Sequence, residues 1–140
     1  MSQYFDNVDL KSEIREYNTK ILSYSFSFKT DNGVFSKEKL DFGTRVLLEN
    51  LPLDEIHGKV LDIGCGYGPI GIFIKKTTDS SIDMIDINKR ALHLTKMNAK
   101  LNNVDVNVFE SDAYSNVKEK YNYIITNPPI RVGKKILYSI

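Results

Sequence analysis

The chain has 140 residues, of which 41% are hydrophobic and 26% are charged, and its formal net charge is +1. This length allows one domain with a sizeable core, and the balanced charge excludes a general electrostatic attraction to nucleic acid or to a membrane surface. The single cysteine, Cys65, excludes an internal disulfide and argues against a cysteine-based zinc site, so no metal is predicted. No apolar stretch approaches the roughly 20 residues of a membrane span, and the polar N-terminus is unlike a signal peptide, so we expect a cytoplasmic protein.

The first part of the chain predicts an extension that contains a strand and a helix. Residues 23–30 (SYSFSFKT) alternate polar and apolar side chains, which predicts a half-buried strand. A weak helical pattern precedes it over residues 9–17, and residues 31–33 predict a turn. A second helix is expected after Asp41, whose side chain suits an N-cap, and Pro52 is expected to end it. The apolar faces of the strand and of this helix carry Tyr24, Phe26 and Phe28, and Phe42, Val46, Leu47 and Leu51.

From Lys59 onward, the pattern alternates between strand and helix. Pro69 suits the first turn of one helix, and Asn88 suits the N-cap of another. Such an alternation predicts a parallel sheet with right-handed crossovers, a Rossmann-like α/β fold with helices on both faces. Residues 134–140 resemble the beginning of a further helix. The predicted strands cover residues 60–63, 81–87, 104–109 and 121–126, and the predicted helices cover residues 69–77 and 89–101.

A glycine-rich turn joins the first of these strands to its helix. Residues 64–71 contain four glycines, which permit positive φ and let a ligand approach the bare backbone. The N-terminus of the following helix attracts an anionic group such as a carboxylate. Residues 66–71 match G-x-G-x-x-G, and Asp86, at the end of the next strand, is suited to hydrogen-bond ribose hydroxyls. The pattern therefore predicts a cofactor that contains a nucleoside, either a nicotinamide or an adenosyl cofactor. The structural alternative is a tight turn that binds no ligand.

Two further carboxylates favour the adenosyl cofactor. Asp62 stands before the first glycine, where a nicotinamide site has little use for an acid but the amino group of S-adenosylmethionine can be bound directly or through water. Asp112 follows the third strand and can accept a hydrogen bond from the amino group of an adenine at the strand ends. The structural alternatives are an ion pair for Asp62 and a helix cap for Asp112. Cys65 is interpreted as a small side chain of the turn, not as a nucleophile.

An Asn-Pro-Pro sequence follows the fourth strand. Pro128 and Pro129 fix φ at about −65°, and Asn127 precedes a proline and therefore avoids the helical region. The Asn127 side-chain oxygen and the Pro128 carbonyl can each accept one N–H of a planar amine. Two such acceptors favour a pyramidal nitrogen whose lone pair faces a sulfonium methyl group, and they stabilise the charge that grows on nitrogen. The structural alternative is a rigid corner between strand and helix.

These motifs resemble the class I S-adenosylmethionine-dependent methyltransferases. The segments VLDIGCGYGPIG, DMIDIN, ESDA and TNPPIRVGK carry this resemblance. The upstream segment TDNGVFSKEKLDFG narrows it to the RsmC-like guanine-N2 methyltransferases of small-subunit ribosomal RNA, including their short single-domain members. The resemblance implies methyl transfer from S-adenosylmethionine to the exocyclic N2 amine of a guanine, with ribosomal RNA or the small ribosomal subunit as partner. It also implies that residues 32–36 (NGVFS) lie near the cofactor pocket.

The predicted site combines the motifs with what the resemblance implies. Asn127 and Pro128 are assigned as catalytic residues. Pro129, Ile130 and Arg131 are assigned to substrate binding, although many amine methyltransferases place an aromatic residue where this chain has Ile130. The predicted cofactor-binding residues are Asp62, Gly64, Cys65, Gly66, Gly68, Asp86, Ile87, Asp112, Ala113 and Asn127.

The resemblance also leads us to expect an incomplete domain. The family's sheet has seven strands, whereas the pattern in residues 1–140 supplies only the first four core strands of a single methyltransferase domain, with an N-terminal extension over residues 1–57 and a cofactor-binding half over residues 58–140. The fourth strand would then be an exposed edge, which predicts self-association, low stability or loss of catalysis. The alternatives are an amine methyltransferase acting on DNA adenine or protein glutamine, a non-catalytic cofactor-binding or partner-binding remnant, and a nicotinamide oxidoreductase.

Overall fold

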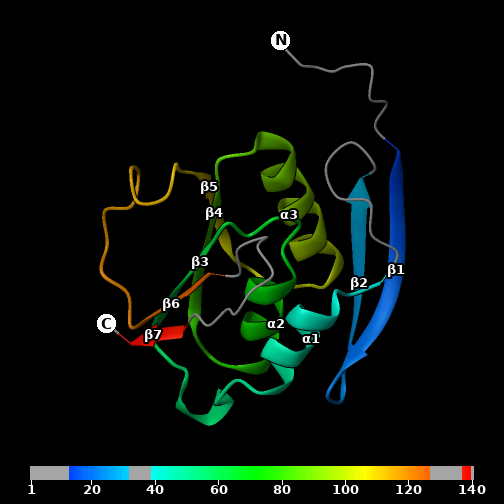
Figure 1. Cartoon of the computed structure of the whole chain (residues 1–140), viewed down its shortest axis with the longest axis horizontal. Helices are drawn as coiled ribbons and strands as arrows, with labels where there is room; N and C mark the ends of the chain where they lie inside the picture. Colours follow the sequence, from blue (N-terminus) through cyan, green and yellow to red (C-terminus); the bar gives the residue numbers. More distant parts are fainter. Residues whose placement is uncertain (1–12, 32–38, 127–136, 140) are drawn as a thin grey trace.

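A five-stranded sheet carries the predicted alternation of strands and helices (Figure 1). The computed structural model describes residues 13–31, 39–126 and 137–139. Its strand order is β5-β4-β3-β6-β7, with the first four strands parallel and β7 antiparallel to β6. The predicted Rossmann-like α/β fold class is therefore confirmed. The strands are β3 (Lys59–Ile63), β4 (Ser81–Asp86), β5 (Asn107–Glu110), β6 (Tyr123–Thr126) and β7 (Leu137–Ser139).

The helices start where the sequence predicts, because each N-terminus has a local signal. Asp41 accepts a hydrogen bond from the Thr44 N–H at 3.2 Å, and Pro69 occupies the first turn of its helix. Asn88 Oδ1 accepts from two backbone N–H groups, at 2.8 and 3.1 Å. The helices are α1 (Phe42–Glu49), α2 (Pro69–Thr77) and α3 (Lys89–Leu101), with a short 3-10 turn, η1 (Leu53–Glu55). Within the described part of the chain, none of them combines the length and the apolar character that crossing a membrane requires.

All three α-helices of the described residues lie on one face of the sheet, whereas helices on both faces were expected (Figure 1). The chain moves from β3 to β4 to β5 in one direction across the sheet, so two right-handed crossovers put α2 and α3 on the same side. The opposite face carries a smaller apolar cluster of Leu61, Ile85 and Tyr121. Half-buried Val117, from the segment between β5 and β6, packs against this cluster.

A β-hairpin covers the outer side of the helices (Figure 1). Its strands, β1 (Ile14–Ile21) and β2 (Tyr24–Asp31), pair antiparallel along their whole length. Phe26 and Phe28 are buried as predicted, and the Phe26 ring lies 5.8 Å from that of Phe73 in α2. The weak helix predicted over residues 9–17 is wrong for residues 14–17, which belong to strand β1. Pairing with β2 overrides their weak local preference for a helix. Residues 9–12 and the predicted turn at residues 32–33 lie outside the described residues.

The predicted apolar face of α1 is partly wrong. Phe42 is 78% exposed and Val46 is 42% exposed, whereas Leu48 is fully buried. A helix of 8 residues has only two turns, so the periodic pattern determines its rotation poorly.

The C-terminal segment differs most from its prediction. Residues 137–139 form strand β7, not the beginning of a helix, and β7 pairs with β6. A short apolar run does not distinguish helix from strand, and the free backbone groups of a sheet edge favour pairing. Strand β6 therefore lies between β3 and β7, so the expectation that this strand is an exposed edge for self-association is wrong. Strand β5 starts at Asn107 and β6 at Tyr123, each later than predicted.

Candidate functional site

The glycine turn and the end of β4 are joined by short hydrogen bonds. The backbone N–H groups of Gly64 and Cys65 both donate to the Ile85 carbonyl at 2.9 Å. The Gly66 N–H donates to Asp86 Oδ2 at 2.9 Å, and the other oxygen of this carboxylate accepts from the Asn88 N–H at 2.9 Å. These bonds bring the carboxyl ends of β3 and β4 together. We call the edge formed by residues 62–68, 85–88 and 110–113 the rim.

Open space lies in front of the first glycine of the turn. Gly64 has a φ of +70°, and a Cβ built on it would meet no atom within 4 Å. Gly71 has the opposite surroundings, because a Cβ there would lie 2.6 Å from the Met84 side chain, so that this side chain or α2 would have to shift. The first glycine therefore leaves room for a ligand, whereas the last one permits close packing of helix on strand.

Asp62 is a buried acid with one unused oxygen. Its side chain is fully buried behind the turn, and Oδ2 accepts a hydrogen bond from the Gly71 N–H at 3.0 Å. Oδ1 has no hydrogen-bond partner among the described residues. Burial raises the pKa of this carboxyl from 3.8 to about 7. The structure gives no ion pair to Asp62 within its described residues, so the structural alternative for this acid is not observed. A ligand that donates a hydrogen bond or carries a positive charge fits this site.

Asp112 lies on the same rim as Asp86. The N–H of Ser111, the preceding residue, donates to the Asp86 carbonyl at 3.1 Å. The Asp112 side chain is exposed, and the chain continues in turns over the next residues, so the helix cap considered as an alternative is not observed. Ala113, the next residue, has a positive φ of 53°, and Ile87 exposes 60% of its surface beside Asp86. The rim therefore combines acceptors with an exposed apolar side chain.

Cys65 has a structural role in the turn. Its side chain is only 6% exposed, and its Sγ lies 3.6 Å from the Thr95 hydroxyl. Burial raises the pKa of the thiol above its usual range, which keeps it protonated and unreactive. This agrees with its interpretation as a small side chain of the turn.

The structure brings together most of the predicted cofactor residues and leaves the predicted substrate residues undescribed. Gly64, Cys65, Gly66 and Asp86 are linked directly, as described above. Residues 127–131, which include every predicted catalytic and substrate-binding residue, lie outside the described residues. Strand β6 ends at Thr126, opposite Ile63 in the sheet register, and therefore on the same edge as the rim.

Three groups around the turn were not predicted as site residues. The Thr95 hydroxyl donates to the Gly66 carbonyl at 2.8 Å, and the Asn98 amide donates to the Tyr67 carbonyl at 2.8 Å. The hydroxyls of Tyr17 and Tyr67 lie 2.7 Å apart. The sequence contains one signal for these contacts, namely that Asn98 and Asn102 stand one turn apart on the helix face that otherwise carries apolar residues.

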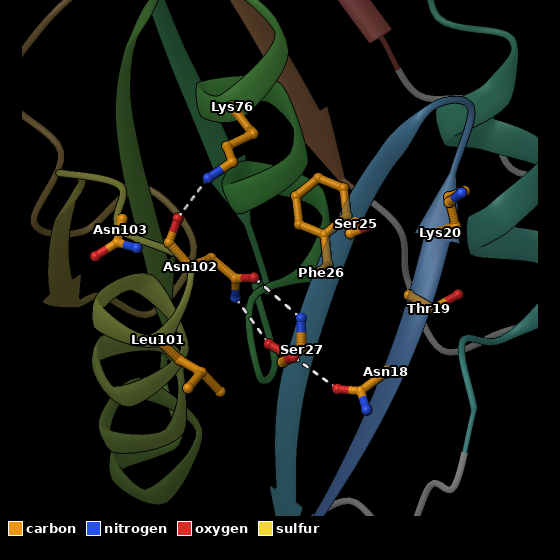
Figure 2. A pocket seen from close by; sticks show the side chains of 10 residues that line it. All are labelled: Asn18, Thr19, Lys20, Ser25, Phe26, Ser27, Lys76, Leu101, Asn102 and Asn103. Carbon is orange, nitrogen blue, oxygen red and sulfur yellow. Dashed lines mark hydrogen bonds between the residues drawn. The ribbon is translucent and has the colours of Figure 1, made fainter.

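A hollow of about 560 Å³ lies away from the rim (Figure 2). The hollow lies between the hairpin and the C-terminal turn of α3, whereas the rim adjoins the N-terminus of the same helix. This helix has 13 residues and is therefore about 20 Å long. The Lys76 ammonium already donates to the Asn102 carbonyl at 2.8 Å. Because the hollow and the rim lie at opposite ends of α3, this hollow is not the predicted cofactor site. Its lining residues are Asn18, Thr19, Lys20, Ser25, Phe26, Ser27, Lys76, Leu101, Asn102 and Asn103.

Arg45 of α1 bonds both to its own helix and to the hairpin. Its guanidinium lies 3.2 Å from a Glu49 carboxylate oxygen and donates to the Thr19 hydroxyl at 2.6 Å. These contacts join α1 to the hairpin.

Comparison with known proteins identifies the family. Residues 25–140 match the family model described as the methyltransferase small domain. The chain belongs to the methyltransferase small domain family. It is 40% identical to the uncharacterized protein YbxB of Bacillus subtilis (strain 168), over 98% of this chain and 70% of that protein. This family, together with the relatives described next, confirms the predicted class I, S-adenosylmethionine-dependent methyltransferase and does not support the nicotinamide oxidoreductase.

Proteins named as methyltransferases of ribosomal RNA are among the most similar relatives. The chain is 41% identical to ribosomal RNA small subunit methyltransferase C of Psychromonas ingrahamii, over 90% of this chain and 36% of that protein. The solved 16S rRNA N2 methyltransferase RsmC of T. thermophilus, in complex with AdoMet and guanosine, superposes with a TM-score of 0.76 at 25% identity, covering 91% of this chain and 36% of that one. The predicted resemblance to RsmC is confirmed. The chain spans little more than a third of these two relatives' length.

Proposed function

We propose that this chain transfers a methyl group from S-adenosylmethionine to the exocyclic N2 amine of a guanine in small-subunit ribosomal RNA. The observation that carries the proposal is the rim, which combines the open space at Gly64 with two acids. One is Asp86, bonded to the turn at 2.9 Å, and the other is buried Asp62 with its unused oxygen. Membership of the methyltransferase small domain family supports the reaction class.

The residues of the rim suit the separate parts of the cofactor. Asp86 has a carboxylate oxygen at the turn and spare lone pairs for two ribose hydroxyls. The unused oxygen of Asp62 suits the amino group of the methionine part, directly or through water. Asp112 suits the adenine amino group, and the exposed side chain of Ile87 suits the adenine ring. Gly68 and Ala113 complete the predicted cofactor contacts of the turn and of the loop after β5.

The predicted catalytic residues would act on the amine of the base. When bound, S-adenosylmethionine supplies an electrophilic methyl group on a positively charged sulfur. Asn127 and Pro128 would each accept one N–H of the guanine amine, which aims the nitrogen lone pair at that methyl group. The N–C bond would form as the S–C bond breaks, and the proton that the nitrogen then carries in excess would leave to solvent. No general base is needed before the transfer.

Ribosomal RNA is the proposed substrate because relatives that are 41% and 25% identical to this chain are named as methyltransferases of small-subunit ribosomal RNA. Pro129 and Ile130 would pack against the base, and Arg131 would meet a phosphate of the same RNA. The balanced net charge of +1 means that recognition of RNA would rest on local contacts of this kind.

The affinity for the cofactor product S-adenosylhomocysteine is expected to rise with pH because of Asp62. The pKa of about 7 lies above the ordinary value of 3.8, so the folded protein holds this proton more tightly than the unfolded chain does. The resulting contribution to stability is complete below about pH 4 and is lost as the pH rises through 7. The ionised carboxylate binds the ligand's ammonium group better, so the affinity rises over the same range.

Isothermal titration calorimetry between pH 5.5 and 8.5 measures this effect. We expect the dissociation constant of S-adenosylhomocysteine to fall roughly tenfold across the range in the native protein. The Asp62→Asn variant, which cannot ionise, should show a flat profile. A native profile as flat as that of the variant would remove Asp62 from the proposed amino-group site.

The proposed function is tested by binding and transfer together. We expect micromolar affinity for S-adenosylhomocysteine, and transfer of a radiolabelled methyl group to small ribosomal subunits or to their naked RNA. Mass spectrometry of the digested RNA should then identify N2-methylguanosine. Transfer to DNA or to protein instead would favour the other amine methyltransferases. Binding without transfer to any of these acceptors would favour a non-catalytic cofactor-binding protein.

A further inference from the structure

Asn98 of α3 and Asn102, the C-cap of this helix, bind the free edge of strand β2. Strand β2 pairs with β1 on one side, so its other edge presents backbone N–H and C=O groups that need partners. Asn102 accepts from the Ser27 N–H at 3.0 Å and donates to the Ser27 carbonyl at 2.8 Å (Figure 2). Asn98 makes the same pair of bonds with Lys29, at 2.7 and 3.0 Å. Each amide therefore imitates one residue of a neighbouring strand, and α3 is joined to the hairpin at two alternate residues.

The two asparagines differ in where their second N–H points. Asn102 donates it to the Asn98 carbonyl within the same helix, at 2.8 Å. Asn98 donates it to the Tyr67 carbonyl at 2.8 Å, in the middle of the glycine turn. Both amide orientations are determined by their partners, because a strand N–H requires an oxygen and each carbonyl requires an N–H. Fully buried Asn98 therefore links the hairpin directly to the turn, whereas Asn102 does not.

Two further contacts hold the same part of the turn. The Thr95 hydroxyl donates to the Gly66 carbonyl at 2.8 Å, so α3 binds two consecutive carbonyls of the turn. The Tyr17 hydroxyl, from β1, lies 2.7 Å from that of Tyr67, and the two rings meet edge to face with centroids 6.4 Å apart. The C=O and the N–H of a trans peptide group point in opposite directions. Because α3 binds these two carbonyls, the N–H groups of the same two peptide groups point away from α3. The contacts thus determine the orientation of the peptide groups in the turn.

We propose that Asn98 is a positioning residue of the cofactor site, through which the hairpin holds the glycine turn in its ligand-binding conformation. The hairpin is then a working part of the site, not merely an extension that covers the helices. The proposal depends on the proposed function in one respect, namely that the glycine turn is the part of the chain that holds the cofactor.

The matched variants Asn98→Ala and Asn102→Ala test this role. Both lose a pair of bonds to β2, so both should lower the stability, but only Asn98→Ala releases the turn. Amide hydrogen exchange without ligand provides the first readout, at Gly66 and Gly68, whose N–H groups bond to Asp86 and to the Cys65 carbonyl. We expect exchange at these two amides to be at least about tenfold faster in Asn98→Ala than in Asn102→Ala.

Binding of S-adenosylhomocysteine provides the second readout, at a temperature where each variant is folded by circular dichroism. We expect Asn98→Ala to weaken binding about tenfold and Asn102→Ala to change it less than about twofold. Equal effects of the two variants on exchange and on affinity would overturn the proposal and leave Asn98 as a structural residue. A native protein that binds no S-adenosylhomocysteine would refute the proposed function, while the exchange comparison would still decide the role of Asn98.

Tyr17→Phe gives an independent test if Asn98→Ala fails to fold. This variant keeps the buried ring and loses only the hydroxyl that meets Tyr67. We expect faster exchange at Gly66 and Gly68 and weaker binding, both in the same direction as for Asn98→Ala but smaller. Unchanged exchange and affinity in Tyr17→Phe would contradict a hairpin that holds the turn.

Discussion

Replacing Asn127 with alanine is expected to reduce methyl transfer by a factor of about 10² to 10³ and to leave the affinity for S-adenosylhomocysteine nearly unchanged. The reason lies in the chemistry of the acceptor. The lone pair of an exocyclic amine is delocalised into the ring, so the nitrogen attacks only when its hydrogens are held by acceptors that favour the pyramidal form. Removing the side-chain oxygen of Asn127 removes one of the two proposed acceptors, and the remaining Pro128 carbonyl cannot orient the amine alone.

Single-turnover methyl transfer and calorimetry, performed on the same preparations, measure the two quantities. Asn122→Ala is the matched control, because Asn122 precedes the same strand at its other end, where its side chain accepts from the Lys59 N–H at 2.8 Å. The control should lose some stability and keep its transfer rate. If the affinity of Asn127→Ala collapses together with its rate, the residue holds the cofactor, and the proposed role at the amine is wrong.

Asp86→Asn is expected to weaken the binding of S-adenosylhomocysteine by about 10- to 100-fold. The two oxygens of Asp86 accept from the N–H groups of Gly66 and Asn88, both at 2.9 Å. An amide has only one oxygen, so one of these two acceptors would be replaced by a donor facing a donor. Charge-assisted bonds to the ribose hydroxyls would also be lost, and bonds to charged groups contribute about 1.5–3 kcal/mol each. The variant would therefore weaken one of the bonds between the turn and β4 and would lose part of its contacts with the ligand.

Asp83→Asn is the control for this experiment. Asp83 lies in the same strand but three residues earlier, and therefore on the opposite face of the sheet. Its carboxylate accepts from the Tyr121 hydroxyl at 2.6 Å and from the Asn107 amide at 3.3 Å. This variant should lower the free energy of unfolding without a comparable loss of ligand affinity. Similar dissociation constants for the two variants would mean that Asp86 supports only the fold.

Elements that depend on residues close in sequence form as predicted. The helix that begins at Pro69 and the caps at Asp41 and Asn88 were predicted because each signal acts within a few residues. The meeting of Gly66 with Asp86 was also predictable, because the carboxyl ends of adjacent parallel strands share one edge of the sheet.

Strands β1 and β7 were not predicted, because their partners and not their own sequences decide their conformation. Residues 14–17 become extended by pairing with residues 28–31, and residues 137–139 by pairing with β6. Short segments with weak or ambiguous periodicity are determined by such distant contacts.

The sequence by itself determined the α/β order from β3 to β6, the glycine turn and the acids at the ends of the strands. These features depend on backbone geometry and capping, which act over one or two turns of chain. Only the tertiary structure decided how the turn is held, since the Asn98 amide connects Lys29 with Tyr67 across 69 and 31 positions of sequence. An asparagine in a helix has the same local preferences whether it faces solvent or a strand edge, so its role exists only once β2 and the turn pack on either side of α3.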